Sequence, residues 1–291
     1  MKWFTQIHKD QNLIAAEKLA ARLPDILLEA QNIAQTVQSG EHGRRKAGGG
    51  AHFWQYRNYD PLVDAASRID WRQSARSDHL YVREQEEERA QTAVIWLDPS
   101  SAMHYSSAPD QYKTKYEYGF TMACVLGYLL TSAGERVKIA GIDTVAHHPK
   151  QMPRLADALL KSPPVPDFTG QRNAKIILIS DFLNQDMIEV RKLARQVNQG
   201  QGQGQGMVLQ SVDPAERDYR FDGHVKFETV DAARQFETRN AKALKADFAE
   251  RFTAHCAEIR QIFGHSGVIS LHSDKPLYEA AVKCANHLIL S

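Results

Sequence analysis

Two aspartates that follow apolar runs are the residues of this sequence best placed to do chemistry. Asp98 comes directly after the run Thr92–Leu97, and Asp181 comes directly after the run Ala174–Ser180. Ser100 stands two residues beyond Asp98 and adds a hydroxyl oxygen. Carboxylate and hydroxyl oxygens suit a hard cation, and Mg²⁺ keeps several of its waters, so few protein ligands suffice. The pattern therefore indicates a candidate magnesium site formed by Asp98, Ser100 and Asp181.

The two apolar runs predict how these aspartates are positioned. Short, nearly continuous apolar runs are typical of strands in a parallel sheet that is covered by helices on both faces. Ligands of such open sheets bind beyond the carboxyl ends of the strands. Because Asp98 and Asp181 follow their strands directly, we expect both carboxylates at one edge of one sheet.

The rest of the chain alternates between strand and helix patterns. This alternation predicts an α/β fold, Rossmann-like, with a mostly parallel sheet and helices on both faces. A short returning strand at 145–147 predicts an antiparallel hairpin at one edge. Further strands are predicted at 136–142, 207–212, 225–230 and 267–271, and helices at 113–132, 152–160, 186–198, 232–263 and 276–290.

The first ninety residues have a different character. Apolar residues at three- and four-residue spacing predict helix over 13–37, broken or kinked at Pro24 and ended by Ser39 and Gly40. We therefore divide the chain into an N-terminal helical region (1–45), an Arg-, Asp- and aromatic-rich segment that packs on the core (46–91), and the α/β domain (92–291).

The Arg-rich segment offers guanidinium groups beside carboxylates and aromatic rings. Guanidinium pairs with carboxylates through two parallel hydrogen bonds and stacks on rings. We interpret the cluster as a structural network, with a site for an anion or an acidic partner as the alternative. Nucleic acid is disfavoured because interleaved acids cancel the basic charge. The residues of this network are Arg57, Arg68, Asp70, Trp71, Arg72, Arg76 and Arg83.

Composition narrows the classes of partner. The formal net charge is +1, so bulk electrostatics gives no reason to expect nucleic acid or an anionic membrane as partner. Cys124, Cys256 and Cys284 are far apart in apolar stretches, which favours reduced, packed cysteines over metal ligands. The sequence shows neither a signal-peptide pattern nor an apolar run long enough to span a bilayer, and we expect a cytoplasmic protein.

The loop after the first apolar run resembles the metal-ion-dependent adhesion site of von Willebrand factor A domains. That site has the pattern Asp-x-Ser-x-Ser, and Asp98 and Ser100 match its first two positions, while Ala102 stands at the third. The resemblance assigns Asp181 to the family's later aspartate, and Met152 and Pro153 stand where its threonine is expected. Two of five positions are lost, so the resemblance implies weak or absent Mg²⁺ binding and no other cofactor.

The segment before that loop carries a series of short motifs. They are Gly50–Phe53, Tyr56–Tyr59, Arg68–Arg72, Ala75–Arg76 and Val82–Glu88. With these motifs the segment resembles the bacterial family with a domain of unknown function fifty-eight. The resemblance implies a von Willebrand A-type domain in an adaptor that works beside a MoxR-type AAA+ ATPase and remodels other proteins.

These observations favour an interaction module over an enzyme. Ser100 has no histidine placed by a recognisable motif to activate it, because proximity of His104 in a loop does not orient an imidazole. We expect the loops after the two strands to present Met103, Tyr105, Phe182 and Leu183 to a protein partner. The alternatives are a metal-dependent hydrolase that uses Asp98 and Asp181, and a purely structural subunit.

Overall fold

The structure is a computed structural model that describes residues 17–42, 53–62, 64–77, 79–85, 91–168, 171, 174–200, 206–229, 235–264 and 267–290. Side chains at 41–42, 53–55, 68, 83–85, 198–200 and 289–290 are not described. The chain forms two compact units. Met1–Gly40 together with Gln91–Ser291 form the main unit, and Glu41–Ala90 form the small unit.

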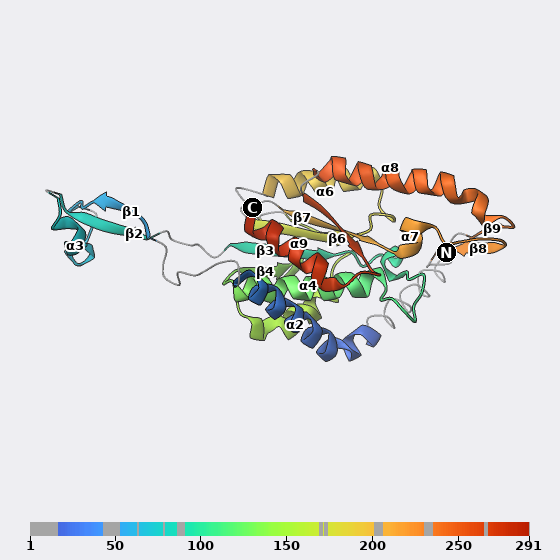
Figure 1. The fold of residues 1–291 in the computed structure, drawn as a ribbon, viewed down its shortest axis with the longest axis horizontal. Coiled ribbons are helices and arrows are strands. Elements are labelled where there is room, and N and C mark those ends of the chain that lie inside the picture. The colour runs from blue at the N-terminus through green and yellow to red at the C-terminus, as the bar shows by residue number, and fades with distance from the viewer. Residues whose placement is uncertain are drawn as a thin grey trace. The chain divides into compact units, whose positions relative to one another are not determined.

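The main unit is built on a six-stranded sheet with the order β10-β7-β6-β3-β4-β5 (Figure 1). All neighbouring pairs are parallel except β4 and β5, which form an antiparallel edge hairpin. The predicted mixed α/β class with a mostly parallel sheet is thereby confirmed. The strands are β3 (Thr92–Leu97), β4 (Arg136–Ile139), β5 (Ile142–Ala146), β6 (Ala174–Ser180), β7 (Met207–Val212) and β10 (Val268–His272).

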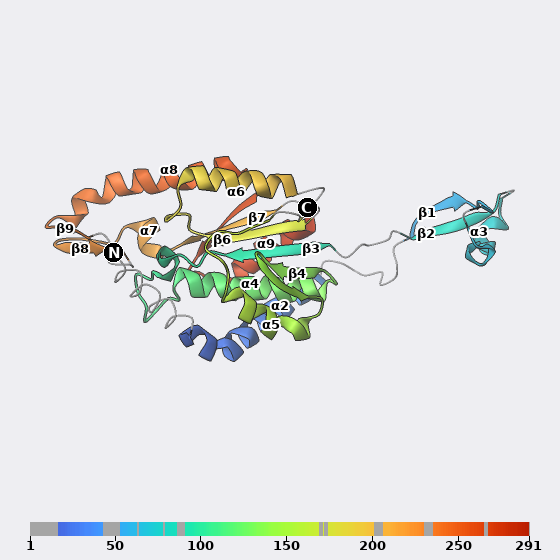
Figure 2. The same cartoon turned by 180° about the vertical axis from the view of Figure 1, so that it is seen from behind.

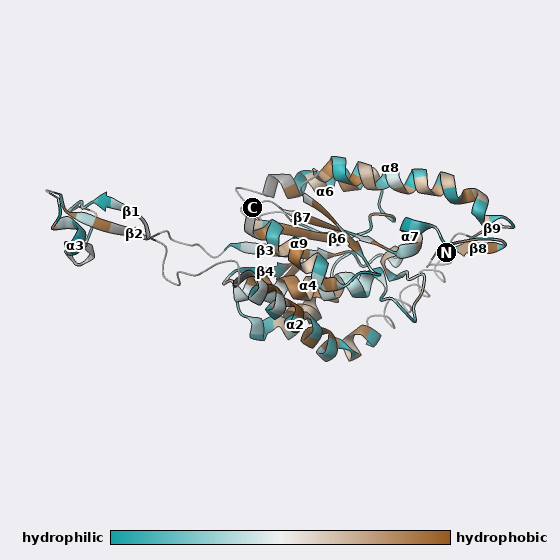
Figure 3. Cartoon of the chain, viewed as in Figure 1, coloured by the Kyte–Doolittle hydropathy of each residue, from teal (hydrophilic) through white to brown (hydrophobic). Residues whose placement is uncertain are grey.

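Alternate residues of each central strand enter two separate hydrophobic cores. In β3, Ile95 and Leu97 enter one core and Val94 and Trp96 enter the other. Because successive side chains of a strand point to opposite faces, a strand buried on both faces needs an unbroken apolar run. Figure 3 shows β6 and β7 in the colours of hydrophobic residues, whereas α8 mixes hydrophobic and hydrophilic ones.

Helices cover both faces of the sheet (Figures 1 and 2). One face carries α4, α5 and α9, and the other carries α6 and α8. No helix in the described part of the chain combines the length and apolar character needed to cross a membrane. The helices of the main unit are α2 (Leu23–His42), α4 (Lys115–Ser132), α5 (Met152–Leu159), α6 (Met187–Gly200), α7 (Pro214–Asp218), α8 (Lys245–Phe263) and α9 (Leu277–Leu290), with single 3₁₀ turns at η2 (Ser101–His104), η3 (Pro149–Gln151) and η4 (Ala241–Leu244).

Helix α2 belongs to the main unit rather than forming a region of its own. It begins at Leu23, with Pro24 in its first turn, where a missing N–H costs no helical hydrogen bond. Its side chains Ala30 and Val37 are buried in the core that α4 and α9 share. The helix continues past Ser39 and Gly40 to His42, so the predicted end at residue 37 was five residues too early.

The long helix predicted over 232–263 was wrong in its first part. Gln235–Thr238 is a strand, β9, which pairs with β8 (Val225–Glu228) as an antiparallel hairpin, and α8 begins only at Lys245. Phe227 lies opposite Phe236 in this pairing, and cross-strand aromatic pairs stabilise a two-stranded ribbon.

The small unit is a two-stranded hairpin with a short helix. β1 (Phe53–Asn58) pairs antiparallel with β2 (Tyr81–Gln85), and η1 (Ala66–Arg68) and α3 (Trp71–Ser74) connect them. Val82 and Ile69 are buried. Asp70 caps α3 because its carboxylate accepts hydrogen bonds from the N–H groups of Arg72 and Gln73.

Candidate functional site

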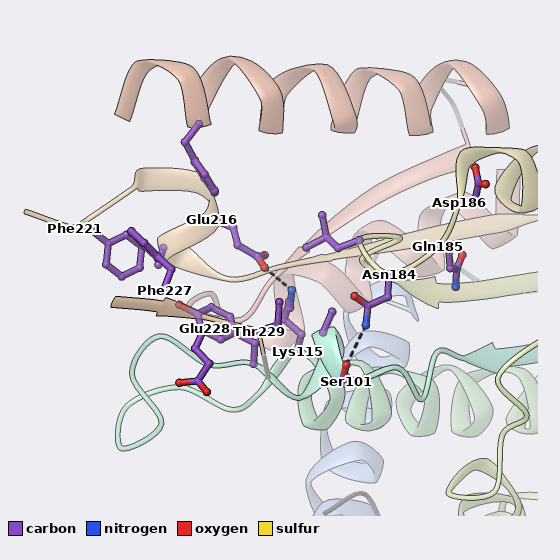
Figure 4. A pocket seen from close by; sticks show the side chains of 15 residues that line it. Ser101, Lys115, Asn184, Gln185, Asp186, Glu216, Phe221, Phe227, Glu228 and Thr229 are labelled. Atoms are coloured by element: carbon purple, nitrogen blue, oxygen red, sulfur yellow. Dashed lines mark hydrogen bonds and ion pairs between the residues drawn. The ribbon is translucent and has the colours of Figure 1, made fainter. Parts of the chain in front are cut away.

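An open cavity lies at the carboxyl edge of the main sheet, where the loops after β3 and β6 meet α7, the β8–β9 hairpin and α8 (Figure 4). Its volume is about 960 Å³, which is near the upper end of the usual range for ligand pockets. It is lined by Ser101, Ala102, Tyr105, Lys115, Leu183, Asn184, Gln185, Asp186, Ala215, Glu216, Phe221, Phe227, Glu228, Thr229 and Phe248.

The cavity has two chemically different ends (Figure 4). Phe221 and Phe227 lie at one end, with ring centroids 5.0 Å apart in an edge-to-face arrangement. Asn184 and Asp186, from the loop after β6, lie at the other end. Lys115, at the start of α4, lies between them. An elongated ligand that spans the cavity therefore contacts aromatic rings at one end and amide and carboxylate groups at the other.

Asp98 is buried at this edge and has hydrogen-bonding partners on both oxygens. Oδ1 accepts from the Ser100 N–H at 2.8 Å, and Oδ2 accepts from Ser180 Oγ at 2.6 Å and from Gln185 Nε2 at 3.2 Å. Burial raises the pKa of the Asp98 carboxyl, and these hydrogen bonds only partly oppose that effect. The nearby charge of Asp181 raises the pKa further.

Asp181 is paired with a lysine that the sequence analysis did not single out. Lys115 Nζ lies 2.7 Å from Asp181 Oδ2 and 2.5 Å from Glu216 Oε1. The side chains of Lys115 and Asp181 are each only 1% exposed, and that of Glu216 is 13% exposed. We call Lys115, Asp181 and Glu216 the buried ion triad.

The charge state of the triad follows from its burial and its partners. Burial lowers the pKa of Lys115, but the carboxylates of Asp181 and Glu216 raise it by more, so the net shift is upward and the amine stays protonated. Burial raises the pKa of Glu216, and Lys115 only partly opposes that shift. A protonated amine has no lone pair, so Lys115 is unsuited to act as a nucleophile.

Local caps position the two ends of the triad. Thr114 caps α4, because its Oγ accepts from the Glu117 N–H, and so fixes Lys115 in the first turn. Glu216 is held by a capping box at the start of α7, where its Oε2 accepts from the Asp213 N–H at 2.9 Å. The box is readable in the sequence as an Asp followed three residues later by a Glu; nothing local marks Lys115 as the partner.

The predicted magnesium ligands are brought to one edge. Both carboxylates have protein partners, whereas the buried Ser100 Oγ has no hydrogen-bond partner among the described residues. Asp98 and Asp181 lie at the same edge, and Ser100 adjoins Asp98. The ammonium of Lys115 supplies beside Asp181 the positive charge that a cation would supply. Across the described residues, no group of three or more His, Cys, Asp or Glu side chains is arranged to hold a metal ion.

The four side chains expected to face a partner separate into two pairs. Met103 and Phe182 are fully buried, so the prediction that they are exposed was wrong. Met103 belongs to the 3₁₀ turn η2, and its side chain packs against Gly119 of α4. Phe182 packs against Phe263 of α8. Leu183 is 43% exposed, and both Leu183 and the half-buried Tyr105 line the cavity.

An aromatic cluster around the β8–β9 hairpin went unnoticed in the sequence. Tyr219 contacts Phe221 at 5.3 Å and Phe248 at 5.2 Å between ring centroids. Phe227 stacks on Phe236, which is 55% exposed. The clustering of aromatic residues over 219–252 was the available signal, and the wrong helix prediction for 235–244 hid it.

The Arg-rich segment forms only part of the predicted network. Arg57 Nη2 lies 2.8 Å from Oδ1 of Asp64, a carboxylate whose side chain is 1% exposed. Arg72 and Arg76 are exposed, and neither pairs with a carboxylate among the described residues. Trp71 is 64% exposed. The side chains of Arg68 and Arg83 lie outside the described part of the chain.

The cysteines are as the sequence predicts. Cys124, Cys256 and Cys284 are free and buried. Burial raises the pKa of Cys124 and of Cys284 to about 12, so both remain thiols at neutral pH.

Comparison with known proteins gives one match. Neither the curated proteins nor the solved structures include a significant match to the chain. The family described as "Protein of unknown function DUF58" matches residues 55–258, which is more than half of the sequence and spans both the small unit and the cavity. The chain belongs to this DUF58 family.

Proposed function

We propose that this chain is a non-enzymatic protein-binding module of the von Willebrand A type. In this proposal it acts in the cytoplasm as an adaptor beside a MoxR-type AAA+ ATPase and needs no cofactor. The observation that carries the proposal is the cavity of about 960 Å³ at the carboxyl edge of the sheet, whose walls combine half-buried aromatic rings with already paired charges.

The walls of the cavity favour a protein ligand. Phe227 and Phe248 supply apolar area that a partner can cover, and Leu183 adds an exposed aliphatic side chain. Aromatic anchors surrounded by polar groups are typical of the energetic centres of protein interfaces. The cavity is also open to solvent, which suits a segment of a larger molecule.

The ionisable groups of the cavity support a binding role over catalysis. Lys115 is held protonated between two carboxylates, and Asp98 is satisfied by three protein donors. His104, the histidine closest to Ser100 in sequence, stacks on Tyr116 at 4.5 Å instead of facing a hydroxyl. Hydrolysis through Asp98 and Asp181 would require both carboxylates to give up these partners.

A pull-down with a MoxR-type AAA+ ATPase tests the proposal. The double variant Leu183→Ala/Phe227→Ala removes apolar contacts from two walls of the cavity. We expect it to lose most of the binding while its circular dichroism spectrum stays that of the native protein. Ile188→Ala is the matched control, because Ile188 is 62% exposed on α6 and does not line the cavity.

Retention of the ATPase by the folded double variant would contradict a role for the cavity. In that case the exposed Trp71 and Arg72 of the small unit become the next surface to remove. Loss of binding in the Ile188→Ala control as well would show that the assay reports general destabilisation.

A further inference from the structure

We propose that the cavity takes a basic segment of its partner, in which lysine or arginine side chains alternate with apolar ones. This inference rests on the proposed protein-binding function and specifies the chemistry of the partner. It follows from which polar groups of the cavity are already used and which remain open.

Lys115, the lysine among the described residues that line the cavity, is committed to the protein itself. Lys115 is buried between Asp181 at 2.7 Å and Glu216 at 2.5 Å, and its Nζ lies 5.8 Å from the centre of the Tyr105 ring. An acidic side chain entering the cavity would meet those two carboxylates instead of a free ammonium. Binding an acid there would require the triad to break, which leaves a buried carboxylate unpaired.

The amides of the cavity already donate to neighbours. Asn184 Nδ2 donates to Ser101 Oγ at 3.1 Å, and Gln185 Nε2 donates to Asp98 at 3.2 Å. These bonds hold both side chains with their carbonyl oxygens available as acceptors. A ligand rich in N–H donors therefore matches this end of the cavity.

Carboxylates outnumber unpaired cations among the lining residues that the structure describes. Asp186 and Glu228 are exposed at opposite ends, and Glu216 lies between them. Glu228 Oε1 accepts from Gln235 Nε2 at 2.8 Å, and Lys226, 3.8 Å from Glu228 Oε2, is exposed and pairs only loosely, so the charge of Glu228 stays largely unneutralised. Together with the neutralised Lys115, these groups give the lining a negative charge that attracts a basic segment and repels an acidic one.

The aromatic end fits the same ligand. The faces of aromatic rings attract ammonium and guanidinium groups, and the rings also take up apolar side chains. Phe221 and Phe227 stand edge to face, and Phe248 packs on the adjoining Tyr219. A segment with alternating basic and apolar residues satisfies both the rings and the carboxylates.

Three fluorescein-labelled peptides on one leucine–phenylalanine scaffold, with lysine, glutamine or glutamate at every second position, test the inference. Their binding to the full-length protein is measured by fluorescence anisotropy at 0.15 M salt. We expect the lysine peptide to bind about tenfold more tightly than the glutamine peptide, and the glutamate peptide to bind more weakly than both. Glutamate-peptide binding equal to or tighter than lysine-peptide binding would overturn the proposal.

A conservative double variant tests whether the charge preference arises from the carboxylates of the cavity. Asp186→Asn/Glu228→Gln keeps side-chain size and acceptor oxygens, including the cap that Asp186 provides to the Ile188 N–H. We expect about fivefold weaker binding of the lysine peptide and unchanged binding of the glutamine peptide. Glu250→Gln, an exposed change on α8 outside the cavity, is the charge control and should leave both affinities as they are. Equal weakening by the control and the double variant would overturn the assignment to the cavity.

Failure of this inference is distinguishable from failure of the proposed function. If cavity variants lose the ATPase but the peptides show no charge preference, the cavity binds protein of another chemistry. If the variants keep the ATPase, the protein-binding role of the cavity itself fails.

Discussion

The cavity edge of the main unit and the small unit both mix basic, acidic and aromatic residues, yet they place them differently. At the cavity edge, Lys115 and Asp181 are each 1% exposed and bonded to one another. In the small unit, Arg57 is 37% exposed although its partner Asp64 is buried, and Arg72 is exposed without an ion-pair partner in the described residues. The buried ion triad of the cavity edge therefore holds structure together, whereas the arginines Arg57 and Arg72 of the small unit remain accessible.

Lys115→Met should produce the largest effect and would test the first half of this comparison. It leaves Asp181 and Glu216 facing one another without a cation, and removal of one partner from a buried ion pair costs about 3–5 kcal/mol. The thermal midpoint should fall by roughly 10 °C or more. Differential scanning calorimetry measures the change.

Lys113→Met is the matched control for that prediction. Lys113 pairs with Glu29 at 2.6 Å, but the two side chains are 28% and 43% exposed, so its loss should cost no more than about 1 kcal/mol. Equal losses for the two variants would contradict the distinction between buried and exposed ion pairs.

A smaller effect is expected in the small unit, where Asp70 is an N-cap and Arg72 an exposed side chain. Asp70→Ala removes two hydrogen bonds to the start of α3 and should destabilise residues 53–85 by about 1 kcal/mol. Arg72→Ala should change the stability by no more than about 0.5 kcal/mol. Hydrogen exchange followed by mass spectrometry reads this unit separately from the main one. A larger loss of stability for Arg72→Ala than for Asp70→Ala would contradict this prediction and support the structural arginine network.

The smallest effect is expected from magnesium. Because Lys115 already neutralises Asp181 and Ala102 provides no side-chain oxygen, we predict a Mg²⁺ dissociation constant of about 1 mM or weaker. At 1 mM MgCl₂ this corresponds to at most about 0.4 kcal/mol of added stability, or roughly 1–2 °C in the thermal midpoint. Micromolar affinity by calorimetric titration would contradict the prediction.

The boundaries of the central strands followed from local sequence, because a strand buried on both faces has to be apolar throughout. β6 and β7 begin and end where predicted, at Ala174–Ser180 and Met207–Val212. The edge hairpin of β4 and β5 also followed from its alternation. The bounds of such strands can therefore be predicted from consecutive residues alone.

The site depended on contacts that local sequence does not encode. Lys115 meets Asp181 and Glu216 across 66 and 101 residues of chain. The sequence predicted an exposed Phe182 because this residue lies in the loop after β6, but Phe263 of α8 packs on it. Exposure of a loop side chain is decided by elements far away in the sequence.

The pairing of β1 with β2 bears on how this polypeptide could have been assembled. Phe53 lies opposite Gln85, so the described ends of the small unit lie on neighbouring strands, about 5 Å apart. A module whose N- and C-terminal ends lie close together can be inserted into another domain without separating the segments of that domain. The main unit is such a domain, because α2 and the residues after 90 contribute to one hydrophobic core. The described residues between 53 and 85 thus have the geometry of a transferable module.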